Sequence, residues 1–186
     1  MNVEIRKAEE TDAAFIAVSI LDAVGLPEPS DELLQCTTEL CKRDDVLYSW
    51  RNTLIAYADG QPAGSITAYE GKNYIGMKTI TFELVKQATG NDFTRMEPET
   101  LPGEYYLDSL SVRPQFRRLG IGRQLMEAAI DEAMHTDATT TTLACDPANV
   151  KARHLYETLG FEHRSDMFIF GGNYLKMVKD IENNKA

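Results

Sequence analysis

The sequence has few cysteines and no long run of apolar residues. Its three cysteines, Cys36, Cys41 and Cys145, form neither an even set nor a metal-binding spacing. This favours a reducing cytoplasm over a disulfide framework and predicts no metal site. No apolar stretch approaches the roughly 18 residues of a membrane span, and no basic segment followed by an apolar one opens the chain. We therefore expect a cytoplasmic protein with no membrane partner and no signal peptide.

Positive charge is also scarce. The 19 lysines and arginines against 29 aspartates and glutamates give a formal net charge of -10. This balance argues against a nucleic-acid partner and suits a cationic small substrate. None of the three histidines has an acid or a serine at a recognisable spacing, so a hydrolytic triad has no support. The chain contains no repeat or low-complexity tract, and we expect residues 1–186 to form one domain.

One window differs from this acidic background because all its charges are positive. Leu107, Leu110 and Val112 give an apolar segment that stops at Pro114, and a helical pattern begins near residue 119. No acid occurs from residue 109 to 126, whereas four arginines do, at positions 113, 117, 118 and 123. Gly120 and Gly122 leave the backbone bare beside the free N–H groups of a first helical turn, where a phosphate can bind. The window predicts a strand that leads into an anion site.

Three other interpretations fit parts of this window. The glycines are compatible with an ordinary tight entry into a helix, and the arginines with a solvated loop. A dinucleotide-binding fold shares the order strand, Gly-x-Gly, helix, strand and then Asp146, but Leu125 occupies its third glycine position, and Gly120 does not follow the strand directly. A Walker A loop is excluded because no Gly-Lys-Ser/Thr follows the glycines.

The spacing Arg117-x-x-Gly120-x-Gly122, after Leu110-Ser111-Val112-x-Pro114, resembles the coenzyme A signature of the GNAT superfamily of acyl-CoA-dependent N-acyltransferases. The resemblance implies that residues 117–122 wrap the pyrophosphate and that the preceding strand pairs with the pantetheine arm. It therefore implies acetyl-CoA as co-substrate. The implied contacts are Leu110, Ser111, Val112, Arg117, Arg118, Leu119, Gly120, Ile121, Gly122 and Arg123.

Residues 149–161 resemble the second signature of that family, N-x-x-A-x-x-x-Y-x-x-x-G-F. Spacing alone predicts a helix that is capped by Asn149 and carries a buried tyrosine. The resemblance implies that Asn149 bonds the pantetheine or a water molecule, and that the hydroxyl of Tyr156 protonates the leaving thiolate. Lys151 and Arg153 lie in a stretch without acids and are candidates to meet the 3′-phosphoadenosine end of the cofactor.

The expected strand at residues 104–112 carries further chemistry. Leu107 and Leu110 are three positions apart, so the strand either contains a β-bulge near Asp108-Ser109 or is buried on both faces. A bulge would free a backbone N–H for the acyl carbonyl, and the resemblance implies the amide of Leu110. Asp108 is the best candidate for the general base, although it is equally suited to cap the bulge or pair with an arginine.

Two other residues offer alternative chemistry. Glu104, with a chain of water molecules, is a rival for the general base. Cys145 is either an acyl-carrying nucleophile or, as its small apolar character favours, a buried hydrophobe. The resemblance implies direct attack of the amine on the thioester in a ternary complex, with Tyr156 as the general acid.

Periodicity places the remaining elements. The expected strands cover residues 2–7, 52–58, 61–69, 104–112, 139–145, 161–170 and 173–178, with a hairpin across Gly171-Gly172. One helix follows Thr11 or Asp12 with Phe15, Val18, Ile20, Leu21 and Val24 in its apolar stripe, and others cover residues 32–42, 119–135 and 149–159. Residues 73–100 are interpreted as a helix and a loop that cover the acceptor site or serve packing or a dimer contact, and residues 181–186 as a polar tail.

The resemblance implies an α/β (α+β) GNAT fold, with a mixed, mostly antiparallel sheet of about seven strands, about four flanking helices and a central parallel pair. It predicts an N-acetyltransferase acting on a primary amine, either a small molecule or a peptide or protein amine, and is compatible with a homodimer. The expected acceptor walls, residues 25–31 and 73–100, carry no legible motif. The alternative is a non-catalytic GNAT-like module that binds acyl-CoA as a sensor or interaction protein, but Tyr156, Asn149 and both glycines favour the enzyme.

Overall fold

The computed structural model describes residues 1–181, so the expected polar tail at 181–186 lies outside the described residues except for Ile181. A seven-stranded sheet with the order β1-β2-β3-β4-β5-β7-β6 forms the centre. β4 and β5 are parallel, and all other neighbours are antiparallel. This confirms the mixed sheet with a central parallel pair. The strands are β1 (Val3–Lys7), β2 (Thr53–Ala58), β3 (Gln61–Glu70), β4 (Glu104–Val112), β5 (Thr140–Cys145), β6 (Glu162–Ile169) and β7 (Gly172–Asp180).

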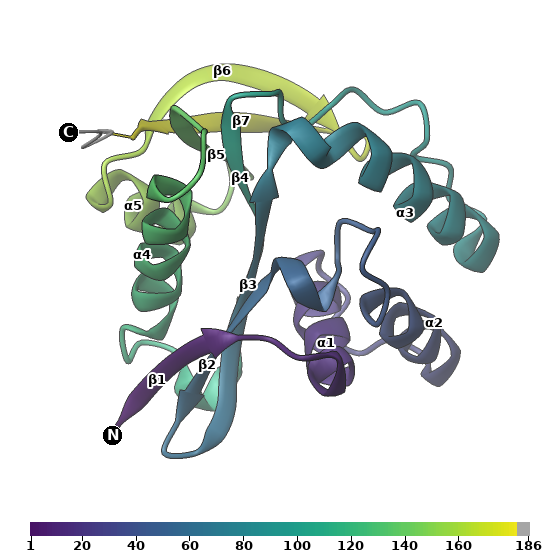
Figure 1. Ribbon diagram of the computed structural model, residues 1–186, viewed down its shortest axis with the longest axis horizontal. Helices are drawn as coiled ribbons and strands as arrows, with labels where there is room; N and C mark the ends of the chain where they lie inside the picture. The colour runs from purple at the N-terminus through teal and green to yellow at the C-terminus, as the bar shows by residue number, and fades with distance from the viewer. Residues whose placement is uncertain (182–186) are drawn as a thin grey trace.

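Helices cover both faces of the sheet (Figure 1). One face carries α1 (Ala13–Ala23), α2 (Asp31–Cys41) and α3 (Tyr74–Thr89), and the other carries α4 (Ile121–Met134) and α5 (Val150–Thr158). The helix expected within residues 73–100 is α3, which ends at the left-handed Gly90 and is followed by a loop. None of the helices in residues 1–181 is both long and apolar enough to cross a membrane.

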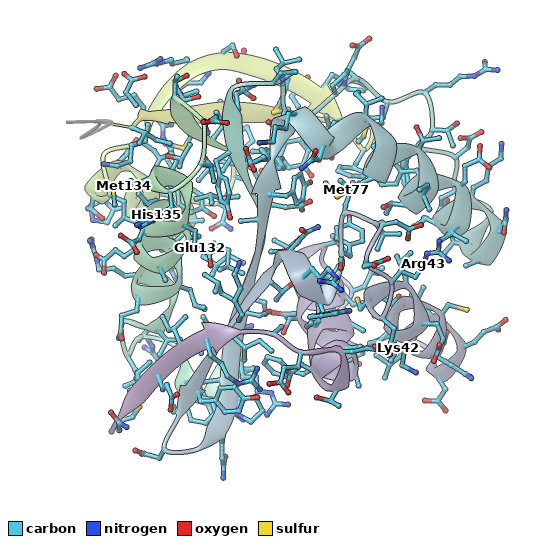
Figure 2. The ribbon with its side chains drawn as sticks, in the orientation of Figure 1. Lys42, Arg43, Met77, Glu132, Met134 and His135 are labelled. Carbon is cyan, nitrogen blue, oxygen red and sulfur yellow. The ribbon has the colours of Figure 1, made fainter. Side chains whose placement is uncertain are left out.

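Each face of the sheet has its own buried cluster. The α4 side buries Ile121, Leu125, Ala129 and Ala133 against the strands. The α1–α3 side is rich in aromatic residues and includes Tyr48, Tyr69, Tyr74, Phe82 and Tyr106. Figure 2 labels Glu132 on the α4 side and Met77 on the α3 side. The two clusters fix the sheet between them, so the ends of β4 and β5 are held in place.

Two details of the predicted elements are wrong. Val18 and Val24 of the first helical stripe are 40% and 54% exposed, because the buried stripe of α1 follows Ala13, Ile16, Ala17 and Ile20 at helical spacing. The last hairpin turns at Phe170-Gly171, with φ of 50 and 77, rather than at Gly171-Gly172. The Phe170 ring packs 5.1 Å from that of Phe93, a contact that offsets the cost of the left-handed backbone.

Candidate active site

The parallel strands β4 and β5 separate partway along their length. Glu104, Tyr105 and Tyr106 pair with Thr140, Thr141 and Thr142. β4 continues to Val112 and β5 to Cys145, but the pairing recorded for the described residues ends at Tyr106. A strand edge released in this way presents backbone N–H and C=O groups without a ladder partner. The separation creates an opening at the centre of the sheet.

A cavity of about 740 Å³ lies at this opening, and its size is typical of small-molecule sites, which span roughly 300–1,000 Å³. Asp108 and Leu110 reach it from β4, and Asn149 and Tyr156 from the start and the body of α5. These four residues were singled out from separate parts of the sequence, and the fold brings them to one cavity. The opposite wall comes from α1, α2, α3 and the loop at residues 90–103.

Asp108 occupies a β-bulge, which decides between the two alternatives for this strand. Thr67 pairs with Ser109 and Ala68 pairs with Leu107, so Asp108 is the extra residue of β4. Its carboxylate accepts hydrogen bonds from the Tyr69 hydroxyl at 2.5 Å and from the Ser109 hydroxyl at 2.9 Å. Burial raises the pKa of Asp108 above its usual range, although these two donors oppose the shift.

Tyr156 presents a hydroxyl with no hydrogen-bond partner among residues 1–181. No buried polar side-chain atom lacks a partner in that range, so this hydroxyl must reach the open space of the cavity that Tyr156 lines. Burial of the ring raises the pKa of Tyr156 to about 12, which keeps the group protonated at neutral pH. Asn149 caps α5 as expected, since its Oδ1 accepts from the amide of Ala152 at 3.1 Å. Its amide nitrogen stays available as a donor.

The loop between β4 and α4 is shaped by two left-handed residues, Arg118 with φ 64 and Gly120 with φ 80. Gly120 is the N-cap of α4, and the first turn has neither a side-chain cap nor an acid. The first amides of α4 therefore lack partners within the helix. Gly122 differs from Gly120, because a Cβ there would meet Val112 at an ordinary 3.7 Å. The fold does not itself require glycine at position 122.

The other residues expected to bind the cofactor lie around this loop. The guanidinium of Arg117 donates to the Val112 carbonyl at 2.7 Å and to Asp22 at 3.2 Å. The Ser111 hydroxyl donates to the same carboxylate at 2.6 Å. Leu119 is 48% exposed, whereas Ile121 is buried in the core beneath α4. Asp22, on α1, therefore fixes one side of the basic loop.

The remaining cations of the predicted site fall into two groups. Arg123 and Arg153 are held by side chains of α4 and α5. Arg118 and Lys151 have no partner among residues 1–181, so their charges are available to a ligand. They flank the starts of α4 and α5, respectively, and Asn149 at the start of α5 lines the cavity.

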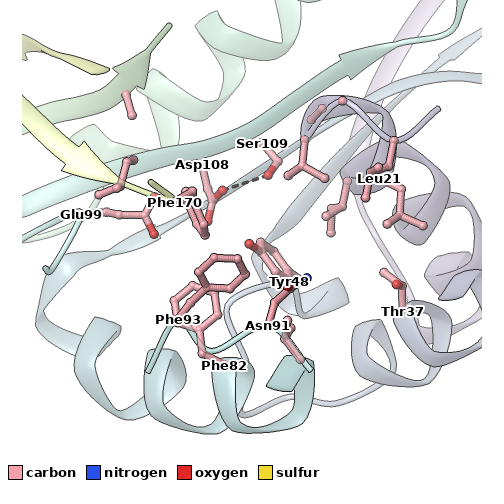
Figure 3. A pocket seen from close by; sticks show the side chains of 18 of the residues that line it. Leu21, Thr37, Tyr48, Phe82, Asn91, Phe93, Glu99, Asp108, Ser109 and Phe170 are labelled. Carbon is pink, nitrogen blue, oxygen red and sulfur yellow. Dashed lines mark hydrogen bonds between the residues drawn. The ribbon is translucent and has the colours of Figure 1, made fainter. Parts of the chain in front are cut away.

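Glu99 is a cavity residue that sequence reasoning missed. It lies in the loop at residues 90–103, is 4% exposed, and accepts hydrogen bonds from the hydroxyls of Tyr106 at 2.9 Å and Tyr74 at 3.1 Å. Burial, followed by the charge of Asp108, raises the pKa of Glu99 to about 8. No local pattern could have revealed it, since the tyrosines that hold Glu99 are distant in sequence or belong to another element. Figure 3 shows Glu99 and Asp108 on the same cavity.

Two alternatives weighed for the chemistry meet structural obstacles. Glu104 does not line the cavity. Its carboxylate is held by the Lys176 ammonium at 2.7 and 2.9 Å and by the Leu101 amide at 3.0 Å. Cys145 does line the cavity, but burial raises the pKa of its thiol, which disfavours the nucleophilic thiolate. Among residues 1–181, no three His, Cys, Asp or Glu residues cluster as a metal site would need.

Comparison with known proteins assigns the family. The model of the Acetyltransferase (GNAT) family matches residues 25–161, which is well over half of the chain, and the chain belongs to this family. A ribosomal protein bS18 alanine N-acetyltransferase from Salmonella typhimurium (strain LT2) is 41% identical over 58 residues, covering 31% of this chain and 39% of that protein. The chain thus matches less than half the length of this curated relative.

Solved structures agree with the fold. A crystal structure of an acetyltransferase superposes with a TM-score of 0.80 at 27% identity, over 96% of this chain and 100% of that chain. An N-acetyltransferase from Staphylococcus aureus Mu50 superposes with a TM-score of 0.78 at 22% identity, over 95% of this chain and 100% of that chain. An aminoglycoside acetyltransferase in complex with coenzyme A superposes with a TM-score of 0.66 at 20% identity, over 98% of this chain and 96% of that chain. The last two likenesses concern the fold alone.

Proposed function

We propose that this protein is an N-acetyltransferase that transfers an acetyl group from acetyl-CoA to a primary amine. The observation that carries the proposal is the meeting, at one cavity, of the open edge of β4 and the unpartnered hydroxyl of Tyr156. A thioester placed between them would have a hydrogen-bond donor for its carbonyl on one side and a proton donor for its sulfur on the other. The free thiols of all three cysteines suit a cytoplasmic setting.

The residues around the opening fit coenzyme A. The uncapped first turn of α4 offers backbone donors and the positive end of a helix dipole to the pyrophosphate. Arg118 and Lys151 supply the cations that are not already held by a protein carboxylate. Leu110, Ser111 and Val112 form the part of β4 beyond its pairing with β5, and this edge would pair with the amides of the pantetheine arm.

In the proposed reaction, each proton transfer is assigned to a residue of the site. The ammonium form of the substrate gives up a proton to the carboxylate pair of Asp108 and Glu99, and the neutral amine nitrogen then attacks the thioester carbonyl carbon. The N–C bond forms while the amide of Leu110 stabilises the charge on the carbonyl oxygen. The C–S bond breaks as the Tyr156 hydroxyl protonates the sulfur. As the amide forms, the nitrogen loses a second proton, which reprotonates the Tyr156 hydroxyl. Free coenzyme A and the N-acetyl product then leave.

Glu99 strengthens the case for a base at this position. A general base works best when its pKa lies near the operating pH, and the value of about 8 for Glu99 meets that condition. Asp108 alone is already engaged by two hydroxyl donors. We therefore extend the predicted base from Asp108 to the pair, with Glu99 as the proton acceptor and Asp108 as its charged neighbour.

Thermal unfolding with acetyl-CoA, NAD and ATP tests the donor site first. A ligand that binds only the native state raises its stability by RT ln(1 + [L]/Kd), so acetyl-CoA alone should raise the Tm. Release of free thiol in the presence of amines then tests transfer. Absence of a shift with acetyl-CoA would refute the proposed function, and a shift without thiol release from any amine would favour the non-catalytic module.

A further inference from the structure

The acceptor side of the cavity is lined mainly by apolar side chains, with the uncharged Thr37, Thr89 and Asn91 among them. α1 with its C-cap, α2 and α3 contribute the apolar residues Leu21, Val24, Leu33, Leu40, Phe82 and Val85 to this wall. Among residues 1–181, no lysine or arginine lines the cavity, and apart from Asp146 after β5 its acids are Glu99 and Asp108, at the end where β4 opens. A ligand in this space would therefore find negative charge at one end only.

Aromatic side chains close the cavity near Glu99. The ring of Phe93 lies 5.8 Å from that of Phe82 and 5.1 Å from that of Phe170, in edge-to-face contacts. The amide of Phe170 donates to the sulfur of Met96 at 3.2 Å. These contacts join α3, the loop at residues 90–103 and the β6–β7 turn, as Figure 3 shows for the three rings. The wall is thus a packed surface built from three separate segments.

Tyr48 adds an unused polar group to the same space. Its side chain is 8% exposed, yet its hydroxyl has no hydrogen-bond partner among residues 1–181. Because no buried polar atom there lacks a partner, the hydroxyl must open into the cavity that Tyr48 lines. Burial, followed by the charges of Asp108 and Glu99, raises the pKa of Tyr48. A buried, protonated hydroxyl beside two carboxyls is suited to hydrogen-bond an amine.

We infer that the acceptor is a small primary amine whose single ammonium or amine group lies among Glu99, Asp108 and Tyr48, and whose remaining body is apolar, as in an alkylamine or an arylalkylamine. This inference rests on the proposed function and specifies its substrate class. A polyamine or an aminoglycoside would place further ammonium groups against leucine, valine and phenylalanine side chains. Removing such a charge from water without a partner costs far more than the apolar contacts return.

A matched pair of amines tests this class. Hexylamine and 1,6-diaminohexane have the same length and differ by one terminal ammonium. We expect thiol release from acetyl-CoA to give a kcat/KM for hexylamine about tenfold or more above that for the diamine, because the second charge meets no carboxylate on the wall. Tyr48→Phe should raise the KM for hexylamine severalfold, by about the loss of one hydrogen bond, with kcat changed less than about twofold.

Substitutions on the apolar wall test the same preference in the opposite direction. Val85→Asp places a carboxylate on the apolar wall and should raise the diamine-to-hexylamine ratio of kcat/KM about tenfold, whereas Val85→Asn, with the same shape and no charge, should not. Leu33→Asp on α2 repeats the test if the α3 variant fails to fold. Equal use of both amines by the native protein, or no use of either, would overturn the apolar class.

Measuring acetyl-CoA binding distinguishes a failure of this inference from a failure of the proposed function. Acetyl-CoA raises the Tm if the donor site is right, whatever the acceptor is. A shift followed by preferred turnover of the diamine refutes only the acceptor class, and the absence of any shift refutes the proposed function itself. Preferred turnover of a peptide with an amino-terminal alanine over hexylamine would replace the small amine by a polypeptide acceptor and would also overturn the inference.

Discussion

The hydroxyl of Tyr69 donates a 2.5 Å hydrogen bond to Oδ2 of Asp108. The Tyr69 ring also lies 5.9 Å from that of Tyr106, whose own hydroxyl donates to Glu99. Two carboxyls are thus held by two tyrosines that contact each other. The cation that acts on Glu99 is Lys78, but its ammonium is held by the Met96 carbonyl. Burial, and after it the charge of Asp108, therefore keeps the pKa of Glu99 raised.

The first prediction concerns the pH dependence of activity. The raised pKa of Glu99 means that kcat/KM should rise with pH and level off above about pH 8. Glu99→Gln should lower kcat/KM about 10²–10⁴-fold, as expected for loss of a general base, and should abolish this rise. Glu104→Gln is the matched control, because its carboxylate is held by Lys176 outside the cavity. If the control loses the pH-dependent rise and Glu99→Gln keeps it, the assignment of the base is wrong.

The second prediction concerns stability. The folded pKa of Glu99, about 8, lies above the value of 4.5 that the carboxyl has in an unfolded chain. Between these two values the unfolded chain has released the proton that the native protein still holds, so the free energy of unfolding should fall as pH rises. Below pH 4.5 and above pH 8 this contribution should be flat. Urea unfolding of the native protein and of Glu99→Gln across this window checks it, and the variant should show a smaller slope.

The third prediction concerns Tyr156. Tyr156→Phe removes the hydroxyl that faces the cavity and leaves the ring, which packs 6.3 Å from that of Phe161. We expect kcat to fall about 10²-fold or more, as for other lost proton donors, while the Kd for acetyl-CoA stays within about threefold, because a single neutral hydrogen bond contributes little to binding. Kinetics and calorimetric titration measure the two quantities. Equal losses in both would mean that Tyr156 binds rather than protonates.

The fourth prediction separates the two glycines of the loop. Gly122→Ala should leave the Tm unchanged or slightly higher, since its Cβ meets ordinary contacts. If the pyrophosphate binds at residues 117–122 as proposed, the added methyl group should raise the KM for acetyl-CoA. Gly120→Ala should lower stability by roughly 1 kcal/mol, because alanine is strained at φ 80. Thermal unfolding and steady-state kinetics distinguish them. An unchanged KM for Gly122→Ala would exclude close approach at this point.

The donor half of the site could be predicted from sequence because its signals are local. Gly120 precedes α4 directly, and Asn149 and Tyr156 are placed by one helix, so spacing alone fixes their relative positions. The bulge at Asp108 was one of two alternatives, since a broken alternation is also typical of a strand buried on both faces. The pairing of β3 with β4 was needed to choose between them.

The acceptor half of the site could not be predicted because it is formed by contacts between residues that are distant in the sequence. Glu99 has the character of an ordinary loop carboxyl until Tyr74 and Tyr106 enclose it, and Tyr48 lies between helices with no pattern around it. Phe170 adopts a left-handed backbone that its residue type disfavours, in a turn that the glycines predicted one position later. Contacts with Phe82 and Phe93 decide that geometry, and neither ring is near it in the sequence.

The hydrogen bond from Tyr74 to Glu99 has a consequence for how this protein could change its substrate. Tyr74 begins α3, and the same helix carries Phe82 and Val85 of the acceptor wall. Tilting α3 outward to admit a bulkier amine would therefore pull on Glu99, the carboxyl that we propose accepts the proton. The size of the acceptor space and the rate of proton transfer are therefore coupled on this side. A wider substrate range is more readily reached by shortening individual side chains than by moving the helix.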